Sequence, residues 1–369
     1  MGLSAAEKLR YARQITLSEI GESGQAKLKQ SSVLIVGAGG LGSPLALYLT
    51  AAGVGRVGLV DFDVVDESNL HRQVLHTQLN LGMHKLDSAC ATLEALNPHV
   101  HVETHPLRLD RSNALEIIRA YDIVADGTDN FATRYLVNDA CVFSNVANVY
   151  GSVFQFEGQV SVFAHGDGPC YRCLYPKPPP PGLVPSCAEG GVLGVLPGLI
   201  GTLQANEVIK LLLGIGHPLI GRMLLLNALG GRWQTLSVRR DPKCEVCGPE
   251  ATITELADYD AFCGFAPTIT VEEFGTLRAQ EEAFFLLDVR QPQESVQTNM
   301  RADQLIPVEE LQSRMHELQA GAEDRIVVHC QTGARSMRAV QALRTAGYSR
   351  AVSLEGGIEA WMHRTSKLA

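Results

Sequence analysis

The chain has 369 residues, of which 46% are hydrophobic and 19% charged, a composition that excludes a disordered protein and is typical of well-buried cores. At about 100–200 residues per domain, this length predicts two domains. A formal net charge of −9 gives no electrostatic footprint for nucleic acid or an anionic membrane, so we expect neither as a partner.

The sequence predicts neither an amino-terminal signal peptide nor a membrane-spanning segment. Residues 1–11 have no apolar core behind a basic flank, and the most apolar stretch, 192–203, is short and interrupted by Gly and Pro. We therefore expect a cytoplasmic protein. Its nine cysteines are an odd number that cannot all pair within one chain, so we read them as thiols for metal binding or catalysis.

Residues 31–250 alternate between strand-like and helix-like patterns. Apolar, β-branched runs lie at 31–40, 56–65 and 121–130, and helix-like runs lie at 44–53 and 131–143. This alternation predicts an α/β fold: a Rossmann-like nucleotide-binding domain with a mostly parallel sheet and helices on both faces.

A glycine-rich loop joins the first strand to the first helix of this domain. Residues 33–42 read VLIVGAGGLG, with Gly37, Gly39 and Gly42 in the G-x-G-x-x-G pattern that lets backbone approach a phosphate at a helix amino terminus. Asp61 ends the next strand, where a carboxylate can bind ribose hydroxyls. A tight strand–helix turn without a ligand is the alternative, but strand, glycines, helix and acid together favour nucleotide binding.

Charged residues after this loop favour a triphosphate. Arg72 ends the run DFDVVDESNLHR, Lys85 lies in GMHK, and Asp129 lies at a strand end in DGTDN, where it is placed to hold magnesium. Each charge alone is compatible with an ordinary surface position. The rival interpretation, a nicotinamide-dependent oxidoreductase built on the glycine loop, gives Lys85 no role.

Five segments in this order resemble the ubiquitin-activating-type adenylyltransferases, with the bacterial MoeB/ThiF enzymes as the closest branch: RYARQI (10–15), GAGGLG, DFDVVDESNLHRQ, GMHK and DGTDN. The resemblance covers about residues 5–250. It implies magnesium-dependent adenylation, with ATP, of the C-terminal glycine of a small ubiquitin-like sulfur-carrier protein that ends in Gly-Gly. It also implies a homodimer, because Arg13 resembles an arginine that reaches the partner subunit's ATP.

The resemblance also implies a set of site residues. The nucleotide and its phosphates would be bound by Gly40, Asp61, Ser68, Asn69, Arg72, Lys85, Asp129 and Asn130, with Asp129 holding magnesium. Arg13 and Arg72 would be catalytic cations. The chemistry needs such charges, because a carboxylate that attacks the α-phosphate is an anion approaching an anion.

Two Cys-x-x-Cys pairs, Cys170/Cys173 and Cys244/Cys247, offer four thiolates, a complete tetrahedral zinc site. A redox dithiol at either pair, or cysteines without a special role, are the alternatives, and the family resemblance supports zinc. The proline-rich run PKPPPPGLVPS precedes Cys187. This segment resembles the family's crossover loop, which implies that Cys187 bonds to the carrier or resolves a persulfide.

The pattern changes after CEVCGPE. We expect domains at 1–248 and 269–369, joined by a linker at 249–268. In the second domain, Cys330 ends an apolar strand in RIVVHCQTGARSMRAV and precedes a loop and a helix. Loop N–H groups and the helix terminus would lower the pKa of this thiol, and Arg335 would add a cation. A buried strand-end cysteine without function is the alternative.

With LLDVRQPQE (286–294) and LEGGIEAW (354–361), this second domain resembles a rhodanese, a smaller α/β domain. The resemblance implies that Cys330 carries sulfur as a persulfide, cradled by residues 331–336. One departure stands at QTNMRADQLIP (297–307), where rhodaneses usually carry a His-Ile-x-Gly-Ala-like segment that is mainly structural.

The fusion resembles the molybdopterin-synthase adenylyltransferase/sulfurtransferase proteins. It implies that a Cys330 persulfide converts the adenylated carrier to a thiocarboxylate, most simply for molybdopterin biosynthesis, with carriers for thiamine, cysteine or tRNA thiolation as alternatives. The sulfur donor would be a cysteine desulfurase or thiosulfate. Cys187 would either reduce the acyl-persulfide or take the acyl group first as a thioester. A non-catalytic scaffold for a ubiquitin-like partner is a third interpretation.

Overall fold

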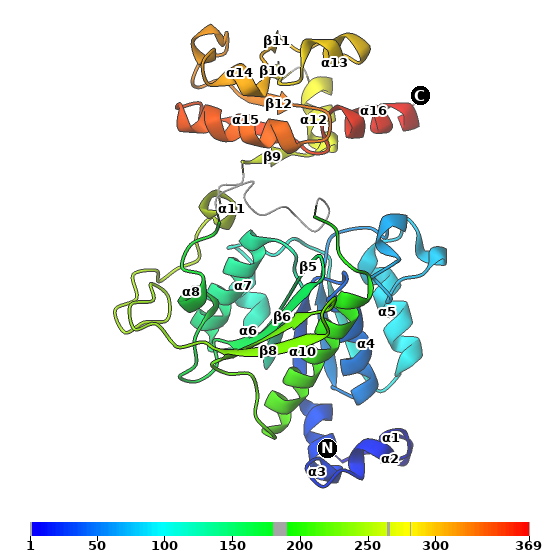
Figure 1. Ribbon diagram of the computed structural model, residues 1–369. Coiled ribbons are helices and arrows are strands. Elements are labelled where there is room, and N and C mark those ends of the chain that lie inside the picture. The colour runs from blue at the N-terminus through cyan, green and yellow to red at the C-terminus, as the bar shows by residue number, and fades with distance from the viewer. Residues whose placement is uncertain (1, 180–189, 264–265, 281, 369) are drawn as a thin grey trace. The chain divides into compact units, whose positions relative to one another are not determined.

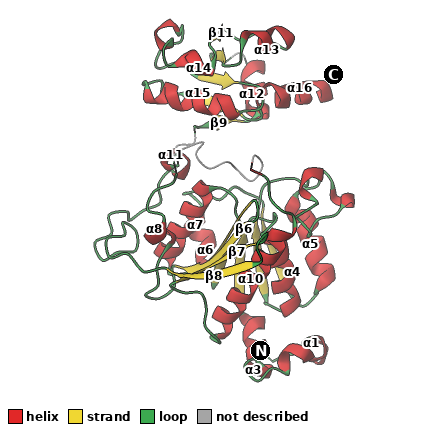
Figure 2. Cartoon of the chain, viewed as in Figure 1, coloured by secondary structure: helices red, strands yellow, loops and turns green. Residues whose placement is uncertain are grey.

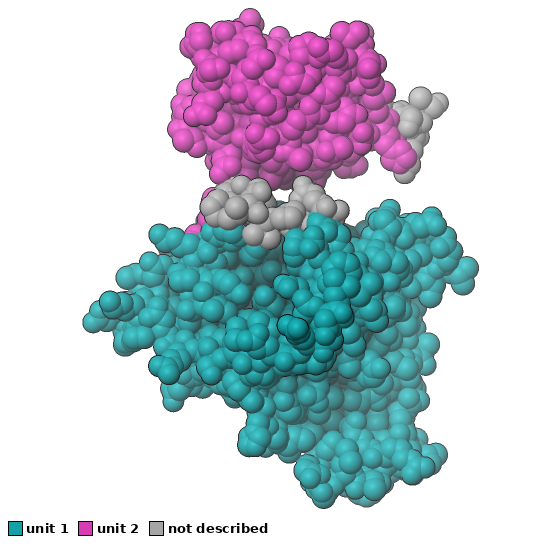
Figure 3. Space-filling model, in the orientation of Figure 1, with its two compact units in different colours: residues 1–259 teal, residues 260–369 magenta. Residues whose placement is uncertain are grey.

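The computed structural model describes residues 2–179, 190–263, 266–280 and 282–368 (Figure 1). The chain divides into two compact units, Met1–Tyr259 and Asp260–Ala369 (Figure 3). The predicted linker, 249–268, contains this division. Its first half packs on unit 1, because Tyr259 is 5% exposed and its hydroxyl donates a hydrogen bond to Asp139 Oδ2 at 2.7 Å.

Unit 1 is built on an eight-stranded sheet in the order β3-β2-β1-β4-β5-β6-β7-β8 (Figure 2). Parallel pairings join β1 (Ser32–Val36), β2 (Arg56–Val60), β3 (His101–His105), β4 (Ile123–Asp126) and β5 (Ala147–Phe154). Antiparallel pairings add β6 (Glu157–Phe163), β7 (Arg222–Asn227) and β8 (Arg232–Ser237). The mostly parallel sheet is confirmed, and the antiparallel edge is a feature that the sequence interpretation did not include.

Helices cover both faces of this sheet. One layer contains α4 (Gly42–Ala52), α5 (Lys85–Leu96) and α10 (Val195–Leu213), and the other contains α6 (Ala114–Arg119), α7 (Phe131–Ser144) and α8 (Tyr171–Leu174). Beyond the edge of the sheet, α3 (Gly21–Gln30) packs against α10 (Figure 1). Short elements complete the unit: α1 (Ala5–Arg10), α2 (Ala12–Ile15), η1 (Glu67–Asn69) and η2 (Gln78–Asn80). In the described part of the chain, no helix combines the length and apolar character needed to cross a membrane.

The central strands carry the core of unit 1. Every residue of β1 is buried, since helices cover it on both faces, and strands in that position read as continuous apolar runs. Leu45 and Leu49 of α4 and Val208 of α10 pack into the same hydrophobic cluster as Val33 and Ile35. This packing fixes the loops that follow the strands.

The carboxyl ends of three strands meet at one edge of the sheet. Val36 of β1 lies in register with Val60 of β2 and with Asp126 of β4, so the loops after these strands are neighbours. The amino-terminal helices lie at the opposite edge (Figure 1), where Lys27 Nζ donates to the Leu213 carbonyl at the end of α10. Open α/β sheets bind ligands at the carboxyl edge, so the loops there are the candidate nucleotide site.

Unit 2 is a smaller α/β domain, as predicted. Its five strands are all parallel, in the order β11-β10-β12-β13-β9: β9 (Thr268–Ile269), β10 (Phe285–Asp288), β11 (Gln304–Leu305), β12 (Ile326–His329) and β13 (Ala351–Leu354). Its helices are α11 (Tyr259–Phe262), which begins at the division, α12 (Val271–Ala279), α13 (Pro292–Gln297), α14 (Val308–Leu311), η3 (Met315–Glu317), α15 (Ala334–Thr345) and α16 (Gly357–Leu368). The segment that departs from the rhodanese pattern supplies β11, which pairs with β10.

Candidate functional site

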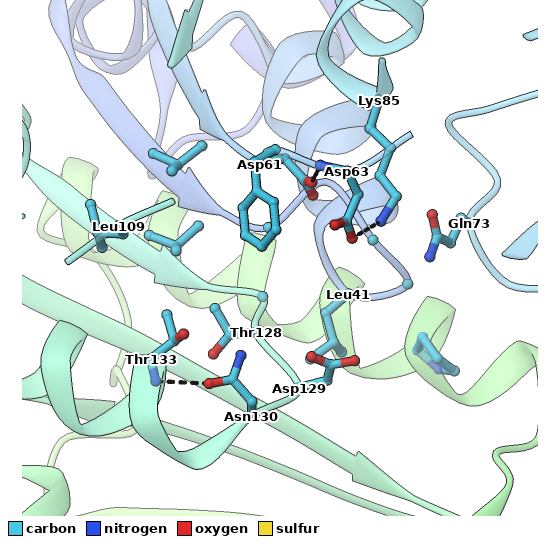
Figure 4. A pocket seen from close by; sticks show the side chains of 18 of the residues that line it. Leu41, Asp61, Asp63, Gln73, Lys85, Leu109, Thr128, Asp129, Asn130 and Thr133 are labelled. Atoms are coloured by element: carbon cyan, nitrogen blue, oxygen red, sulfur yellow. Dashed lines mark hydrogen bonds and ion pairs between the residues drawn. The ribbon is translucent and has the colours of Figure 1, made fainter. Parts of the chain in front are cut away.

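A cavity of about 180 Å³ opens at the carboxyl edge of the unit 1 sheet (Figure 4). The loops after β1, β2 and β4 form most of its wall, and Pro197 of α10 closes one side. The structure brings six of the predicted nucleotide-binding residues together on this wall: Gly40, Asp61, Arg72, Lys85, Asp129 and Asn130.

Two positions of the glycine loop require glycine, Gly37 because of its backbone conformation and Gly42 because of a close approach. Gly37 adopts φ +94°, and a Cβ there would lie 3.1 Å from the Gly127 carbonyl oxygen. A Cβ on Gly42 would lie 1.8 Å from the Gly37 carbonyl oxygen, so only glycine fits. The loop therefore presents bare backbone at Gly39 and Gly40, beside the first turn of α4, which suits a phosphate group.

Asp61 ties the glycine loop to the end of β2. Its Oδ2 accepts a hydrogen bond from the Ala38 N–H at 2.8 Å, and its Oδ1 accepts one from the Asp63 N–H at 2.9 Å. A carboxylate oxygen has a second lone pair, so Asp61 can also accept a hydrogen bond from a ribose hydroxyl in the cavity.

Lys85 is the first residue of α5, and it forms an ion pair that the sequence interpretation missed. Its Nζ lies 2.8 Å from Asp63 Oδ2, with the Lys85 side chain 7% exposed and the Asp63 side chain 52% exposed. Asp63 also lines the cavity. The sequence carried two signals for Asp63: its place within DFDVVDESNLHRQ, and its place two residues after Asp61, on the same side of an extended chain.

Other residues of the cavity were not predicted to belong to the site. Arg134 of α7 is buried, lines the cavity and donates through Nη2 to the Thr128 carbonyl at 3.2 Å. Gln73, Arg108 and Thr128 line it as well. Arg108 and Arg134 add two cations to Arg72 and Lys85. Nothing in the local spacing of Arg134 distinguishes it from an ordinary helix-surface arginine.

Four predicted residues are not placed on the cavity wall by the structure. Ser68 and Asn69 lie on η1 and hold Arg72 through backbone carbonyls: the Ser68 oxygen accepts Arg72 Nη1 at 3.0 Å and the Asn69 oxygen accepts the Arg72 N–H at 3.1 Å. Arg13 is exposed on α2, among the helices at the opposite edge of the sheet (Figure 1). Cys187 lies outside the described residues.

The two Cys-x-x-Cys pairs form one cluster in unit 1. The four sulfur atoms all lie within 4.8 Å of one another, with Cys170 Sγ 3.5 Å from Cys244 Sγ and Cys173 Sγ 3.4 Å from Cys247 Sγ. A tetrahedral site with Zn–S bonds of about 2.3 Å needs sulfur atoms about 3.8 Å apart. The four thiols and their spacing therefore fit a four-sulfur metal site. The sulfur–sulfur distances are too long for disulfides, whose S–S bonds are about 2.05 Å.

Cys330 lies at the carboxyl end of β12 in unit 2, is 1% exposed and faces the loop that begins α15. The Gly333 N–H donates to Cys330 Sγ at 3.1 Å, and the Ser336 hydroxyl lies 3.5 Å from the same sulfur. Gly333 adopts φ +104°, which turns the loop so that its N–H points at the sulfur.

The first turn of α16 supports this loop from outside. The Ile358 N–H donates to the Cys330 carbonyl at 2.9 Å, and the Glu359 N–H donates to the Gln331 carbonyl at 3.2 Å. A Cβ on Gly357 would lie 2.5 Å from the Cys330 carbonyl oxygen, so the close approach requires glycine. Because the carbonyls are held outward, the N–H groups of the loop point inward at the thiol.

These contacts set the pKa of Cys330. Burial alone would raise the pKa of this thiol, but the Ser336 hydroxyl and the N–H groups of Ser336, Gly333 and Thr332 outweigh it and hold the pKa below its ordinary value of 9.0. The positive charge of Arg335, which we expected to stabilise the thiolate, is neutralised by Glu294. Arg335 Nη1 and Nη2 donate to the two carboxylate oxygens of Glu294 at 2.7 and 2.6 Å. Neutral donors therefore stabilise the thiolate.

We predict that iodoacetamide alkylates Cys330 with a pH midpoint below 9.0, since the thiolate is the reacting form. Ser336→Ala should raise this midpoint, because it removes one donor to the sulfur. The rate of alkylation, followed by mass spectrometry of the Cys330 peptide between pH 5 and 10, measures it. Ser349→Ala, at an exposed position, is the control, and an unchanged midpoint in Ser336→Ala contradicts the assignment.

Comparisons with known proteins agree along both units. A model of the ThiF family matches residues 11–246, and one of the rhodanese-like domain matches residues 270–364. The chain is 46% identical over 373 residues to the probable adenylyltransferase/sulfurtransferase MoeZ of Mycobacterium tuberculosis (strain H37Rv), covering 97% of this chain and 94% of that protein. It is 44% identical over 374 residues to the adenylyltransferase and sulfurtransferase MOCS3 of Mus musculus, covering 93% and 81%.

Two further similarities concern unit 1. The sulfur carrier protein adenylyltransferase of Thermus thermophilus is 58% identical over 260 residues, which cover 69% of this chain and 96% of that protein. Among solved structures, that of E. coli MccB with ATP has a TM-score of 0.57 at 23% identity and covers 64% of this chain and 74% of that chain. At this identity the likeness shows the fold alone.

Proposed function

We propose a function for this chain, which belongs to the ThiF family and carries a rhodanese-like domain. It is an adenylyltransferase and sulfurtransferase, as its relatives over the whole chain are named. The proposal is that it adenylates the C-terminal glycine of a small ubiquitin-like sulfur carrier with ATP and then converts that carboxylate to a thiocarboxylate. Molybdopterin biosynthesis is the first pathway to test, with the carriers for thiamine, cysteine and tRNA thiolation as rivals.

One observation carries this proposal: the same chain holds a cation-lined cavity at a glycine loop and a thiol held by N–H donors. Arg72, Lys85 and Arg134 line the cavity and would neutralise the phosphates while the carrier carboxylate approaches. Asp129 lies exposed on the same wall, where a single carboxylate together with phosphate oxygens suits Mg²⁺. Magnesium would supply further positive charge there.

The second half-reaction uses Cys330. Its persulfide, Cys330–S–S⁻, would attack the acyl-adenylate, so that a C–S bond forms, the C–O bond to phosphate breaks and AMP leaves. The thiolate of Cys187 would then attack the Cys330 sulfur, which forms a Cys187–Cys330 disulfide and releases the carrier thiocarboxylate. A reducing thiol would reopen the disulfide. In the alternative order, Cys187 takes the acyl group first as a thioester.

The function is tested by incubating the protein with ATP, Mg²⁺, a sulfur donor and candidate carriers, one at a time. Mass spectrometry of the intact carrier should show one oxygen replaced by sulfur, only when ATP is present. A carrier that stays unmodified although ATP–pyrophosphate exchange proceeds would restrict the activity to adenylation. The carrier that is converted identifies the pathway.

We also propose that the four-cysteine cluster binds zinc, and we predict about one zinc per chain by elemental analysis. Cys244→Ser should lose the metal and lower the melting temperature by about 5 °C or more, because the site clips 170–173 to 244–247. Cys90→Ser is the control, since Cys90 lies outside the cluster and contacts Glu94. A pure, active sample without zinc would reject the assignment.

Arg13 supports the proposal of a homodimer. Its neighbour Gln14 donates to the Ala52 carbonyl at the end of α4 that is remote from the glycine loop, so Arg13 lies away from a nucleotide bound to its own chain. A role for Arg13 in catalysis therefore requires a second copy. Mixing inactive Arg13→Ala and Lys85→Met chains should restore adenylation if each active site combines residues of two chains.

The two other interpretations of the sequence are not favoured. The glycine loop and Asp61 are compatible with a nicotinamide-dependent oxidoreductase, but the relatives that span both domains are named adenylyltransferases and sulfurtransferases. A scaffold that only binds a ubiquitin-like partner would need neither the paired Lys85 nor the N–H donors around Cys330.

A further inference from the structure

Four charged residues and one amide around Cys330 form what we call the sulfur-site rim: Glu294, Glu309, Arg335, Glu359 and Gln331. These residues are linked to the Cys330 loop by hydrogen bonds or by proximity to Arg335. Gln331 follows Cys330 and donates through Nε2 to Glu359 Oε1 at 2.9 Å. Glu309 accepts a hydrogen bond from Gln291 Nε2 at 3.2 Å, and its charge acts on Arg335. The rim thus contains three carboxylates and one guanidinium.

The single cation of the rim is fully engaged. Arg335 makes a two-pronged ion pair with Glu294, at 2.7 and 2.6 Å, and this contact holds the pKa of Glu294 at about 2. Arg290 contacts the rim through Gln331, whose Oε1 accepts a hydrogen bond from Arg290 Nη1 at 3.4 Å, but its side chain is completely buried and pairs with Asp288 at 2.7 Å. Among the described residues of unit 2, the structure shows no ion pair from Glu309 or Glu359 to a cation.

The position of Glu294 is also fixed independently of Arg335. It is the third residue of α13, and its Oε2 accepts a hydrogen bond from the Gln291 N–H at 2.9 Å, which closes the capping box of this helix. The carboxylate therefore stays beside the loop whether or not a ligand is present, so the rim keeps its net negative charge.

Resting on the proposed sulfurtransferase function, we propose that Glu294 is a specificity-determining residue that turns Cys330 away from dianionic sulfur donors such as thiosulfate. A dianion that approaches the rim meets two uncompensated carboxylates and a neutralised arginine. The donor that this rim favours is a persulfide on another molecule's thiol, which carries at most one negative charge at the reacting sulfur.

Both donors react by the same displacement and differ in charge. With a persulfide R–S–SH, the Cys330 thiolate attacks the terminal sulfur, the donor S–S bond breaks, and Cys330–S–S⁻ and R–SH are formed, with the proton passing to the leaving thiolate. With thiosulfate, the same attack on the outer sulfur gives Cys330–S–S⁻ and sulfite, and the leaving group carries both negative charges past the rim. Neither reaction involves net oxidation.

The test compares Glu294→Gln with the natural chain in the full-length protein. Gln keeps a carbonyl oxygen for the α13 cap and removes the negative charge, so Arg335 becomes an uncompensated cation. We measure kcat/KM for thiosulfate and for the persulfide of 2-mercaptoethanol, with cyanide as acceptor, at a pH where the Cys330 thiolate is fully formed. The thiosulfate-to-persulfide ratio should rise about tenfold, mainly through a lower KM for thiosulfate.

Two further variants separate this effect from a general disturbance. Glu294→Gln combined with Arg335→Met should return the ratio to that of the natural chain, because the freed cation is gone. Glu317→Gln is the matched control, since Glu317 also pairs with an arginine, Arg314, at 2.8 Å outside the rim, and its ratio should not change.

An unchanged ratio in Glu294→Gln, or a gain that survives in the double variant, overturns the proposal. Failure of the proposed function looks different: the natural chain would then transfer sulfur from neither donor, and the inference about Glu294 would fall with it.

Discussion

Replacing Cys330 by Ser should abolish sulfur transfer and leave adenylation intact. Ser is nearly isosteric and Cys330 is 1% exposed, so the substitution keeps the packing of the loop while it removes the nucleophile. Sulfur transfer from either donor to cyanide should fall by more than about 10³-fold, as expected for the loss of a covalent catalyst. ATP–pyrophosphate exchange with a carrier should stay within about twofold, since the cavity residues all belong to unit 1.

The geometry of the loop explains why the effect should be this large. The Gly333 N–H and the Ser336 hydroxyl are aimed at one sulfur atom, and a Ser alkoxide in the same place is not formed at neutral pH. Cys90→Ser is the control, because Cys90 is a partly exposed thiol of unit 1 that serves neither site. Sulfur transfer that survives in Cys330→Ser but not in another cysteine variant would move the persulfide to that other thiol.

The sequence was informative wherever a residue type is fixed by backbone geometry. Gly37 and Gly42 stand out because the first needs a positive φ and the second has no room for a Cβ. Cys330 stands out because it directly follows an apolar strand. The central strands β1, β2 and β4 could also be predicted, because helices cover them on both faces and their sequences are therefore continuous apolar runs.

The sequence was least informative where function depends on which charges meet in space. Asp63 pairs with Lys85 across 22 positions, and Glu294 pairs with Arg335 across 41, distances over which no local pattern exists. Arg335 could be predicted to lie at the loop, but its neutralisation could not. The edge strand β8 was missed for a different reason: all six of its residues are exposed, so its pattern has no apolar alternation.

Lys85→Met should lower kcat/KM for adenylation by about 10²–10³-fold and leave sulfur transfer from small donors unchanged. The loss has two parts. The substitution removes a cation from the phosphate end of the cavity, and it leaves the Asp63 carboxylate, formerly 2.8 Å from Lys85 Nζ, as an added negative charge facing the nucleotide. ATP–pyrophosphate exchange with a saturating carrier measures the effect.

A double-mutant cycle separates these two parts. Asp63→Asn alone should cost less than about tenfold, because Lys85 keeps its charge and loses only the partner that orients it. Lys85→Met combined with Asp63→Asn should then be more active than Lys85→Met alone, since the repulsion between Asp63 and the phosphates is gone. Equal activity in these two variants would mean that Asp63 does not face the phosphates. The reaction would then depend on Lys85 for its own charge, and the ion pair would serve only to hold its side chain against α5.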